Sequence, residues 1–208
     1  MKTDLSSKIK LEHIPERYYN PKDEVELATL TQREKLYTKI FETASEGSDY
    51  LAETIVRYIN KYLDNKNKCF IALDAASSLD KTYAKVIELY KEGKIDFTNV
   101  YVYSICEFFP QEPDGPSTLR RLKEVFLDHV NIKKEHIRTF NTGSTKESMF
   151  NCCKAYEQYF AGSGALDLTV CEIGVTGSLG FNGPGTLYTT NCRLVPLNAE
   201  MRHAISEE

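Results

Sequence analysis

A thiol and a carboxylate stand next to each other in this sequence, at Cys106 and Glu107. They follow the run 100–105 (VYVYSI), whose β-branched and aromatic residues predict a strand. A carboxylate can accept a proton as a general base, and an exposed thiol can act as a nucleophile when its pKa is lowered. No basic residue is a near neighbour of Cys106 in the sequence, so a buried and unreactive thiol is the stronger interpretation of that side chain.

Small and hydroxyl-bearing residues follow two further apolar runs. Ser77 and Ser78 come after the run 69–73 (CFIAL), and a glycine-rich stretch, 172–185, comes after the run 166–171 (LDLTVC). Open parallel sheets bind ligands at the carboxyl ends of their strands, where hydroxyl groups can donate hydrogen bonds and glycine lets the backbone approach a ligand closely. These loops therefore predict one ligand-binding crevice, and the alternative is a flexible surface loop of similar composition.

Strands and helices alternate along the chain, which predicts an α/β fold, a three-layer α/β/α domain with a mostly parallel sheet. We expect strands at 35–43, 69–73, 100–105, 136–140, 166–171 and 190–197. We expect helices at about 50–65, 79–90, 117–129 and 145–160, and the start of another after residue 198. Ser48 or Asp49 is the expected N-cap of the first helix, and Ser117 is that of the third.

The composition predicts a globular protein and argues against several classes of partner. The net charge of -4 gives no sign of nucleic-acid binding, and no apolar run is long enough to span a bilayer. The N-terminus lacks the apolar segment of a secretory signal, so we expect a cytoplasmic protein. The six cysteines include no CxxC pair, and we expect neither a metal nor another cofactor.

Residues 1–30 are expected to form an extended N-terminal arm, and residues 31–208 a single α/β domain. From about residue 35 to residue 202, the chain resembles the glucosamine-6-phosphate deaminase (isomerase) family, whose fold is shared with the 6-phosphogluconolactonases. The run 126–132 (FLDHVNI) is similar to the family's F-x-D-H-V-D-I. The residues that match its G-x-x-G-x-x-x-F-N-x-P loop are Gly174, Gly177, Phe181, Asn182 and Pro184.

The resemblance implies a reaction that opens a sugar-phosphate ring, moves a proton between C1 and C2, and releases ammonia. The family has D-E-Y where this chain has C-E-F at 106–108, so the Glu is kept and the proton-transferring Asp is replaced by Cys106. The family's Asp, His and Glu for ring opening fall at Thr176, Ser178 and Gly183. A thiol has an ordinary pKa of about 8.5 and substitutes poorly for a carboxylate base. Loss of a general acid or base typically costs about 10²–10⁴-fold in rate.

The same resemblance implies a phosphate-binding loop, T-G-G-T-P in the family, at residues 75–79. This chain keeps hydroxyl groups there but lacks the glycines. The family's phosphate-binding Arg falls near Glu207, whose charge is opposite, and a further basic residue falls beyond Glu208, so we expect a C-terminally shortened domain. The expected ligand-binding residues are Ser77, Ser78, Gly174, Gly177 and Asn182.

These observations leave three functions open. The first is a catalytically degenerate family member, a pseudoenzyme of amino-sugar metabolism that binds a small sugar phosphate or regulates, as a homo-oligomer or paired with an active relative. The second is an active sugar-phosphate isomerase, deaminase or lactonase with altered residues, in which Glu107 is the base and Cys106 a nucleophile. The third is a non-catalytic interaction module, whose Tyr18-Tyr19 arm and open sheet edge a partner covers. Neither nucleic acid nor membrane is expected as a partner.

Overall fold

The structure of this chain is a computed structural model that describes residues 14–207. It divides into two compact units, with the boundary between Tyr50 and Leu51. Part of the predicted N-terminal arm, residues 1–13, lies outside the described residues. None of the helices in the described range is long and apolar enough to cross a membrane.

The first unit contains a 3-10 turn, Glu16–Tyr18, and the helix α1 (Glu24–Thr31). Asp23 caps α1, because its Oδ1 accepts a hydrogen bond of 2.8 Å from the backbone N–H of Glu26. The extended conformation predicted for residues 14–30 is therefore wrong. Pro15 and Pro21 suggested irregular backbone, but both precede Asp23, and the cap that Asp23 provides allows a short helix to begin after them.

The strand predicted at 35–43 is also wrong. This segment pairs with no strand in the described part of the chain, and Leu36 and Tyr37 are exposed. Instead, Lys39 Nζ lies 3.8 Å from the centre of the Tyr50 ring, a cation–π contact. Alternation of apolar and polar residues is a local pattern, and it cannot supply the neighbouring strand that a ladder requires.

The helix α2 (Ala44–Lys66) begins earlier than predicted. Its cap is Thr43, whose Oγ1 accepts a 3.2 Å hydrogen bond from the backbone N–H of Glu46. The backbone N–H of Thr43 in turn donates a 3.3 Å hydrogen bond to the Glu46 carboxylate, which completes a capping box. The predicted N-cap at Ser48 or Asp49 is therefore wrong, because both residues lie inside the helix.

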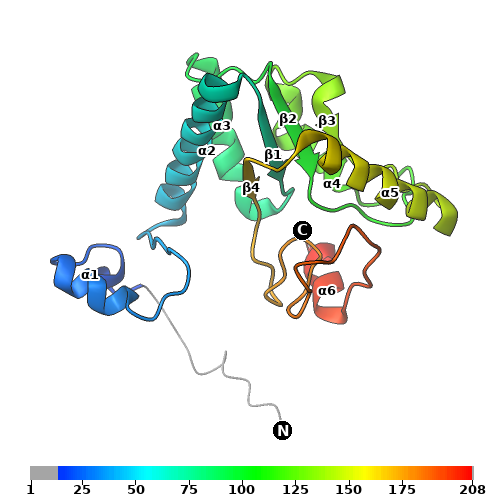
Figure 1. Cartoon of the computed structure of the whole chain (residues 1–208). Coiled ribbons are helices and arrows are strands. Elements are labelled where there is room, and N and C mark those ends of the chain that lie inside the picture. The colour runs from blue at the N-terminus through cyan, green and yellow to red at the C-terminus, as the bar shows by residue number, and fades with distance from the viewer. Residues whose placement is uncertain (1–13, 208) are drawn as a thin grey trace, which may run out of the picture. The chain divides into compact units, whose positions relative to one another are not determined.

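The second unit is built on a parallel four-stranded sheet in the order β3-β2-β1-β4 (Figure 1). The strands are β1 (Cys69–Leu73), β2 (Val100–Ser104), β3 (Ile137–Arg138) and β4 (Leu168–Val170). This confirms the α/β fold with a parallel sheet. The strand predicted at 190–197 is wrong, because the described backbone there forms no ladder, and the N–H of Cys192 donates instead to the Glu157 side chain.

Four further helices belong to this unit. They are α3 (Asp80–Lys91), α4 (Thr118–Val125), α5 (Lys146–Ser163) and α6 (Ala199–Glu207). Ser117 caps α4 as predicted, since its Oγ accepts a 3.2 Å hydrogen bond from the backbone N–H of Arg120. Short 3-10 turns at Ser77–Leu79, Leu127–His129 and Lys134–His136 connect these elements.

Helices cover both faces of the sheet because successive strand residues point to opposite sides. On one face, Ile71 and Val102 belong to the main core, to which α2, α3 and α4 contribute buried side chains. On the other face, Ala72 and Tyr103 pack against Tyr156 of α5. The three layers leave the carboxyl ends of β1, β2 and β4 at one edge of the sheet, where their loops can meet.

Candidate functional site

A cavity of about 380 Å³ lies at the carboxyl ends of β1, β2 and β4. The three loops predicted to converge all contribute to it. It is lined by Asp74, Ala75, Ala76, Cys106, Phe108, Pro116, Ser117, Thr118, Arg120, Arg121, Glu124, Glu172, Gly174, Val175, Ser178, Gly180, Phe181, Met201 and Ile205. The volume falls within the range of sites for small molecules.

Two carboxylates link the loop after β1 to the loop after β4. Glu172 accepts a hydrogen bond from the Ser78 hydroxyl, and its backbone N–H lies 3.3 Å from Asp74 Oδ2. The other oxygen of Asp74 accepts a 2.9 Å hydrogen bond from the N–H of Ala75. The sequence reasoning missed both acids, although each directly follows the last residues of a predicted strand. Ser77 and Ser78, the predicted ligand-binding residues, lie in the 3-10 turn before α3, and neither is among the described residues that line the cavity.

Cys106 lines the cavity as a half-buried side chain. Burial raises the pKa of the Cys106 thiol far above its ordinary value, and the negative charges of Asp74 and Glu107 raise it further. At neutral pH this residue is therefore a neutral thiol, which is neither a proton acceptor nor an activated nucleophile. Its backbone carbonyl accepts hydrogen bonds from the hydroxyl groups of Ser104 and Thr118, which fix the turn after β2.

The carboxylate of Glu107 is saturated by four hydrogen bonds at the start of α4. Oε1 accepts from the N–H groups of Phe108 and Thr118, each at 2.9 Å. Oε2 accepts from Ser117 Oγ at 3.0 Å and from the N–H of Leu119 at 3.2 Å. A carboxylate that meets the free N–H groups at a helix N-terminus stabilises that helix. The geometry gives Glu107 a structural task in the loop.

The glycine-rich loop turns back on itself at Gly174 and Ser178. The N–H of Gly174 donates a 2.9 Å hydrogen bond to the carbonyl of Ser178, and a side chain at Gly174 would lie 2.6 Å from Ser178 Oγ. Ser178 is 3% exposed and lines the cavity with Gly174. Gly177, between them, has a φ of +74°, which favours glycine.

Three predicted residues of this loop, Thr176, Gly177 and Asn182, are not among the described residues that line this cavity. Thr176 does not line it, and its Oγ1 is buried without a hydrogen-bond partner among the described residues. Asn182 pairs through its backbone with Leu179, and it lines a neighbouring cavity of about 690 Å³. That second cavity lies between α5 and the segment 177–197, and it also includes Glu107 and Gly177.

The cavity holds two arginines that the sequence reasoning did not single out. Arg121 donates to both carboxylate oxygens of Asp80, at 2.8 and 2.9 Å, and through Nε to the carbonyl of Ala75 at 2.7 Å. Arg120 donates to two carbonyl groups of the loop that precedes α4. Both guanidinium groups are therefore engaged within the protein.

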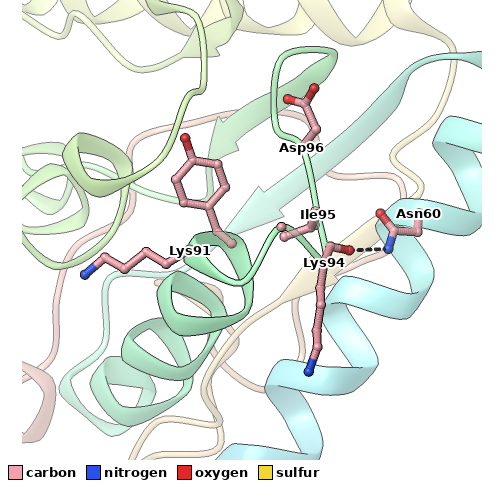
Figure 2. Close-up of a pocket in the computed structure, with 7 residues that line it drawn as sticks. Asn60, Lys91, Lys94, Ile95 and Asp96 are labelled. Carbon is pink, nitrogen blue, oxygen red and sulfur yellow. Dashed lines mark hydrogen bonds between the residues drawn. The ribbon is translucent and has the colours of Figure 1, made fainter.

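A third cavity, of about 520 Å³, lies where α3 leads toward β2 (Figure 2). There the Asn60 amide donates a 2.9 Å hydrogen bond to the carbonyl of Lys94, and Lys91 points away from this contact. Its lining includes none of the predicted site residues. Within the range the structure describes, no group of three or more His, Cys, Asp or Glu residues is arranged to hold a metal ion.

Comparison with known sequences places these features in a family. Residues 42–178 match the family of glucosamine-6-phosphate isomerases/6-phosphogluconolactonase. The chain is 35% identical over all of its 208 residues to a glucosamine-6-phosphate deaminase-like protein of Bacteroides thetaiotaomicron, and covers 31% of that protein. It is 29% identical over 155 residues to the glucosamine-6-phosphate deaminase of Thermoanaerobacter sp. (strain X514), where the match covers 74% of this chain and 60% of the relative. The chain thus spans less than two thirds of either relative.

Solved structures show the same fold. A monomeric glucosamine-6-phosphate deaminase superposes with a TM-score of 0.71 and 24% identity, over 79% of this chain and 66% of that one. The 6-phosphogluconolactonase of Thermotoga maritima superposes with a TM-score of 0.56 and 21% identity, over 64% of this chain and 58% of that one. The family match covers more than half of the chain. The chain therefore belongs to the glucosamine-6-phosphate isomerase/6-phosphogluconolactonase family.

Proposed function

We propose that this domain is a catalytically degenerate member of the family that binds an amino sugar or its 6-phosphate without deaminating it. The observation that carries the proposal is the state of Cys106, which stands where the family's proton-transferring Asp is expected. Its raised pKa leaves a neutral thiol at the cavity instead of a base. In addition, Glu107 is held by four hydrogen bonds, and no histidine stands among the described lining residues.

Two features support retained binding. The cavity lies at the carboxyl ends of the strands, and residues with hydroxyl and carboxylate groups line it from three loops. One relative is named a glucosamine-6-phosphate deaminase and another a glucosamine-6-phosphate deaminase-like protein, which is the reason for testing amino sugars first. The cytoplasmic location, a homo-oligomer and pairing with an active relative stay predictions from the sequence.

Isothermal titration and an ammonia-release assay test this function together. We expect an amino sugar to bind while the domain releases no ammonia from glucosamine 6-phosphate, with the Thermoanaerobacter deaminase as the active control. Ala76 lines the cavity in extended backbone, so Ala76→Trp should fill the cavity and abolish binding. Ala155→Trp, on the exposed side of α5, is the matched control. Measurable ammonia release overturns the degenerate assignment, and absence of any binding overturns the binding assignment.

The second candidate is an active enzyme with altered catalytic residues. The specific observation in its favour is the presence of two carboxylates in the cavity, Asp74 and Glu172, joined by a 3.3 Å contact from the Glu172 N–H to Asp74 Oδ2. Carboxylates at the wall of a cavity are among the groups that serve as general acids or bases in enzymes. Ammonia release or lactone hydrolysis that is lost in Asp74→Asn supports this candidate over the first.

A further inference from the structure

Carboxylates outnumber guanidinium groups around the cavity of about 380 Å³ at the carboxyl ends of β1, β2 and β4. Asp74, Glu124 and Glu172 line it, whereas the basic residues among its described lining are Arg120 and Arg121. A cavity lined by an excess of one sign of charge focuses that field on its interior. An anionic ligand that enters this cavity therefore approaches a surface with an excess of negative charge.

The two arginines do not reverse this balance. Arg121 is already paired with a fourth carboxylate, that of Asp80, at 2.8 Å, and the pair is partly shielded from solvent. Arg120 donates to two carbonyl oxygens of its own loop, which orients its guanidinium group toward the loop backbone. A phosphate could meet only the N–H groups that these contacts leave over, and the positive charge of Arg121 is already balanced by the Asp80 carboxylate.

A hydroxyl group of the loop after β1 is bound to a carboxylate of the loop after β4. The Ser78 hydroxyl, which the sequence suggested as a donor to a bound molecule, donates to the carboxylate of Glu172. Asp74, from the loop after β1, lines the cavity together with Cys106 from the loop after β2, so the Asp74 carboxylate adds negative charge where these loops meet. An ammonium group, by contrast, would gain two carboxylate acceptors.

We propose that this cavity selects an amino sugar that carries no phosphate, and that Glu172 is the specificity-determining residue that repels the phosphate ester. The inference rests on the proposed binding of an amino sugar at this site. The sugar's ammonium group pairs with the carboxylates of Glu172 and Asp74, and the sugar hydroxyl groups meet the polar walls. Among the described lining residues, the cations that a doubly charged phosphate could meet are Arg120 and Arg121, and both already donate hydrogen bonds to acceptors of the protein.

Titration calorimetry with three sugars tests the selection. Glucosamine, N-acetylglucosamine and glucosamine 6-phosphate are compared at about pH 6.5, below the ordinary pKa of an amine. We expect glucosamine to bind at least about tenfold more tightly than either of the others, with the advantage shrinking as salt rises. Equal or tighter binding of the phosphate ester overturns this inference and leaves the proposed function standing. Failure of all three sugars to bind overturns both.

Glu172→Gln removes the charge and keeps the shape of the side chain. We expect this variant to bind glucosamine at least about tenfold more weakly and to lose its discrimination against the phosphate ester. Glu88→Gln, an exposed carboxylate on α3, is the control that should change neither affinity. If circular dichroism shows that Glu172→Gln is unfolded, Asp74→Asn provides the same readout. Unchanged discrimination in a folded variant overturns the role of the carboxylates.

Discussion

Lys66 Nζ lies 2.7 Å from Asp167 Oδ1, and this pair joins the end of α2 to the segment that leads into β4. The other oxygen of Asp167 accepts a 2.8 Å hydrogen bond from the backbone N–H of Phe70 in β1. The Asp167 side chain is 8% exposed, whereas that of Lys66 is 43% exposed. One buried carboxylate thus ties the edge strand, and with it the glycine-rich loop, to the centre of the sheet.

Replacing the two partners should have unequal effects on stability. Asp167→Ala leaves the buried N–H of Phe70 without its acceptor, so we expect a loss of about 1–3 kcal/mol in the free energy of unfolding. Lys66→Ala removes the exposed partner of the ion pair and its cation–π contacts with Tyr62 and Phe70, and it should cost less than about 1 kcal/mol. Urea denaturation of the full chain measures both. Equal losses would show that the ion pair, and not the backbone hydrogen bond, carries the effect.

The thiol of Cys106 should react slowly in the folded chain. Its raised pKa leaves very little thiolate at neutral pH, and the thiolate is the reactive form. We expect iodoacetamide to modify it at least about tenfold more slowly than in the urea-unfolded chain, with a rate that rises with pH. Burial and Asp74 also raise the pKa of Cys171, so that thiol should be slow as well.

Peptide mass spectrometry separates the two sites. The unfolded chain supplies the control rate for each cysteine. Rapid alkylation of Cys106 at neutral pH, with Cys171 still slow, would revive the interpretation of Cys106 as a nucleophile in an active enzyme.

The parts of the fold that the sequence predicted are those set by local patterns. β1, β2 and β4 are apolar runs that end in small or polar residues, and that pattern marks buried strands and the loops that follow them. The strands expected at 35–43 and 190–197 could not be decided this way, because a strand exists only where another strand pairs with it. Local alternation contains no information about that partner.

In the candidate site too, the sequence predicted what a local motif marks and missed what depends on contacts between distant residues. Comparison with a family motif directs attention to positions where the family has catalytic groups, such as Cys106 and Ser178, and the structure places both at the cavity. Asp74 and Glu172 lie outside those positions, so the motif gave no reason to consider them. Their contact depends on the parallel pairing of β1 with β4, which brings residues 98 positions apart together.

Glu107 should contribute to stability through its four hydrogen bonds. Glu107→Ala leaves the N–H groups at the start of α4 without an acceptor, and we expect a loss of about 1–3 kcal/mol in the free energy of unfolding. Glu107→Gln keeps one acceptor oxygen and should lose less than Glu107→Ala. Denaturant unfolding measures both variants. Unchanged stability in Glu107→Ala would contradict the structural role and reopen its assignment as a base.

His136 gives the protein a dependence on pH that can be tested. Its ring stacks on that of Tyr101 with 3.9 Å between the ring centres, and the residue is 8% exposed. Nδ1 has no hydrogen-bond partner among the described residues. Burial lowers the pKa of His136, and the positive charges of Lys133 and Arg138 lower it further, against the opposing effects of Glu135 and of a hydrogen bond with the Val100 backbone.

The sign of the effect follows from this lowered pKa. As the pH falls through about 6.5, the unfolded chain takes up a proton at His136 before the folded chain does, so the free energy of unfolding decreases. The contribution is complete above that pH and is lost as the pH falls toward the folded pKa. His136→Phe keeps an aromatic ring against Tyr101 and removes the titration. We expect the wild-type chain to lose stability relative to this variant between about pH 7.5 and pH 5 in urea unfolding. A difference between the two proteins that stays constant over this range would show that His136 titrates alike in both states.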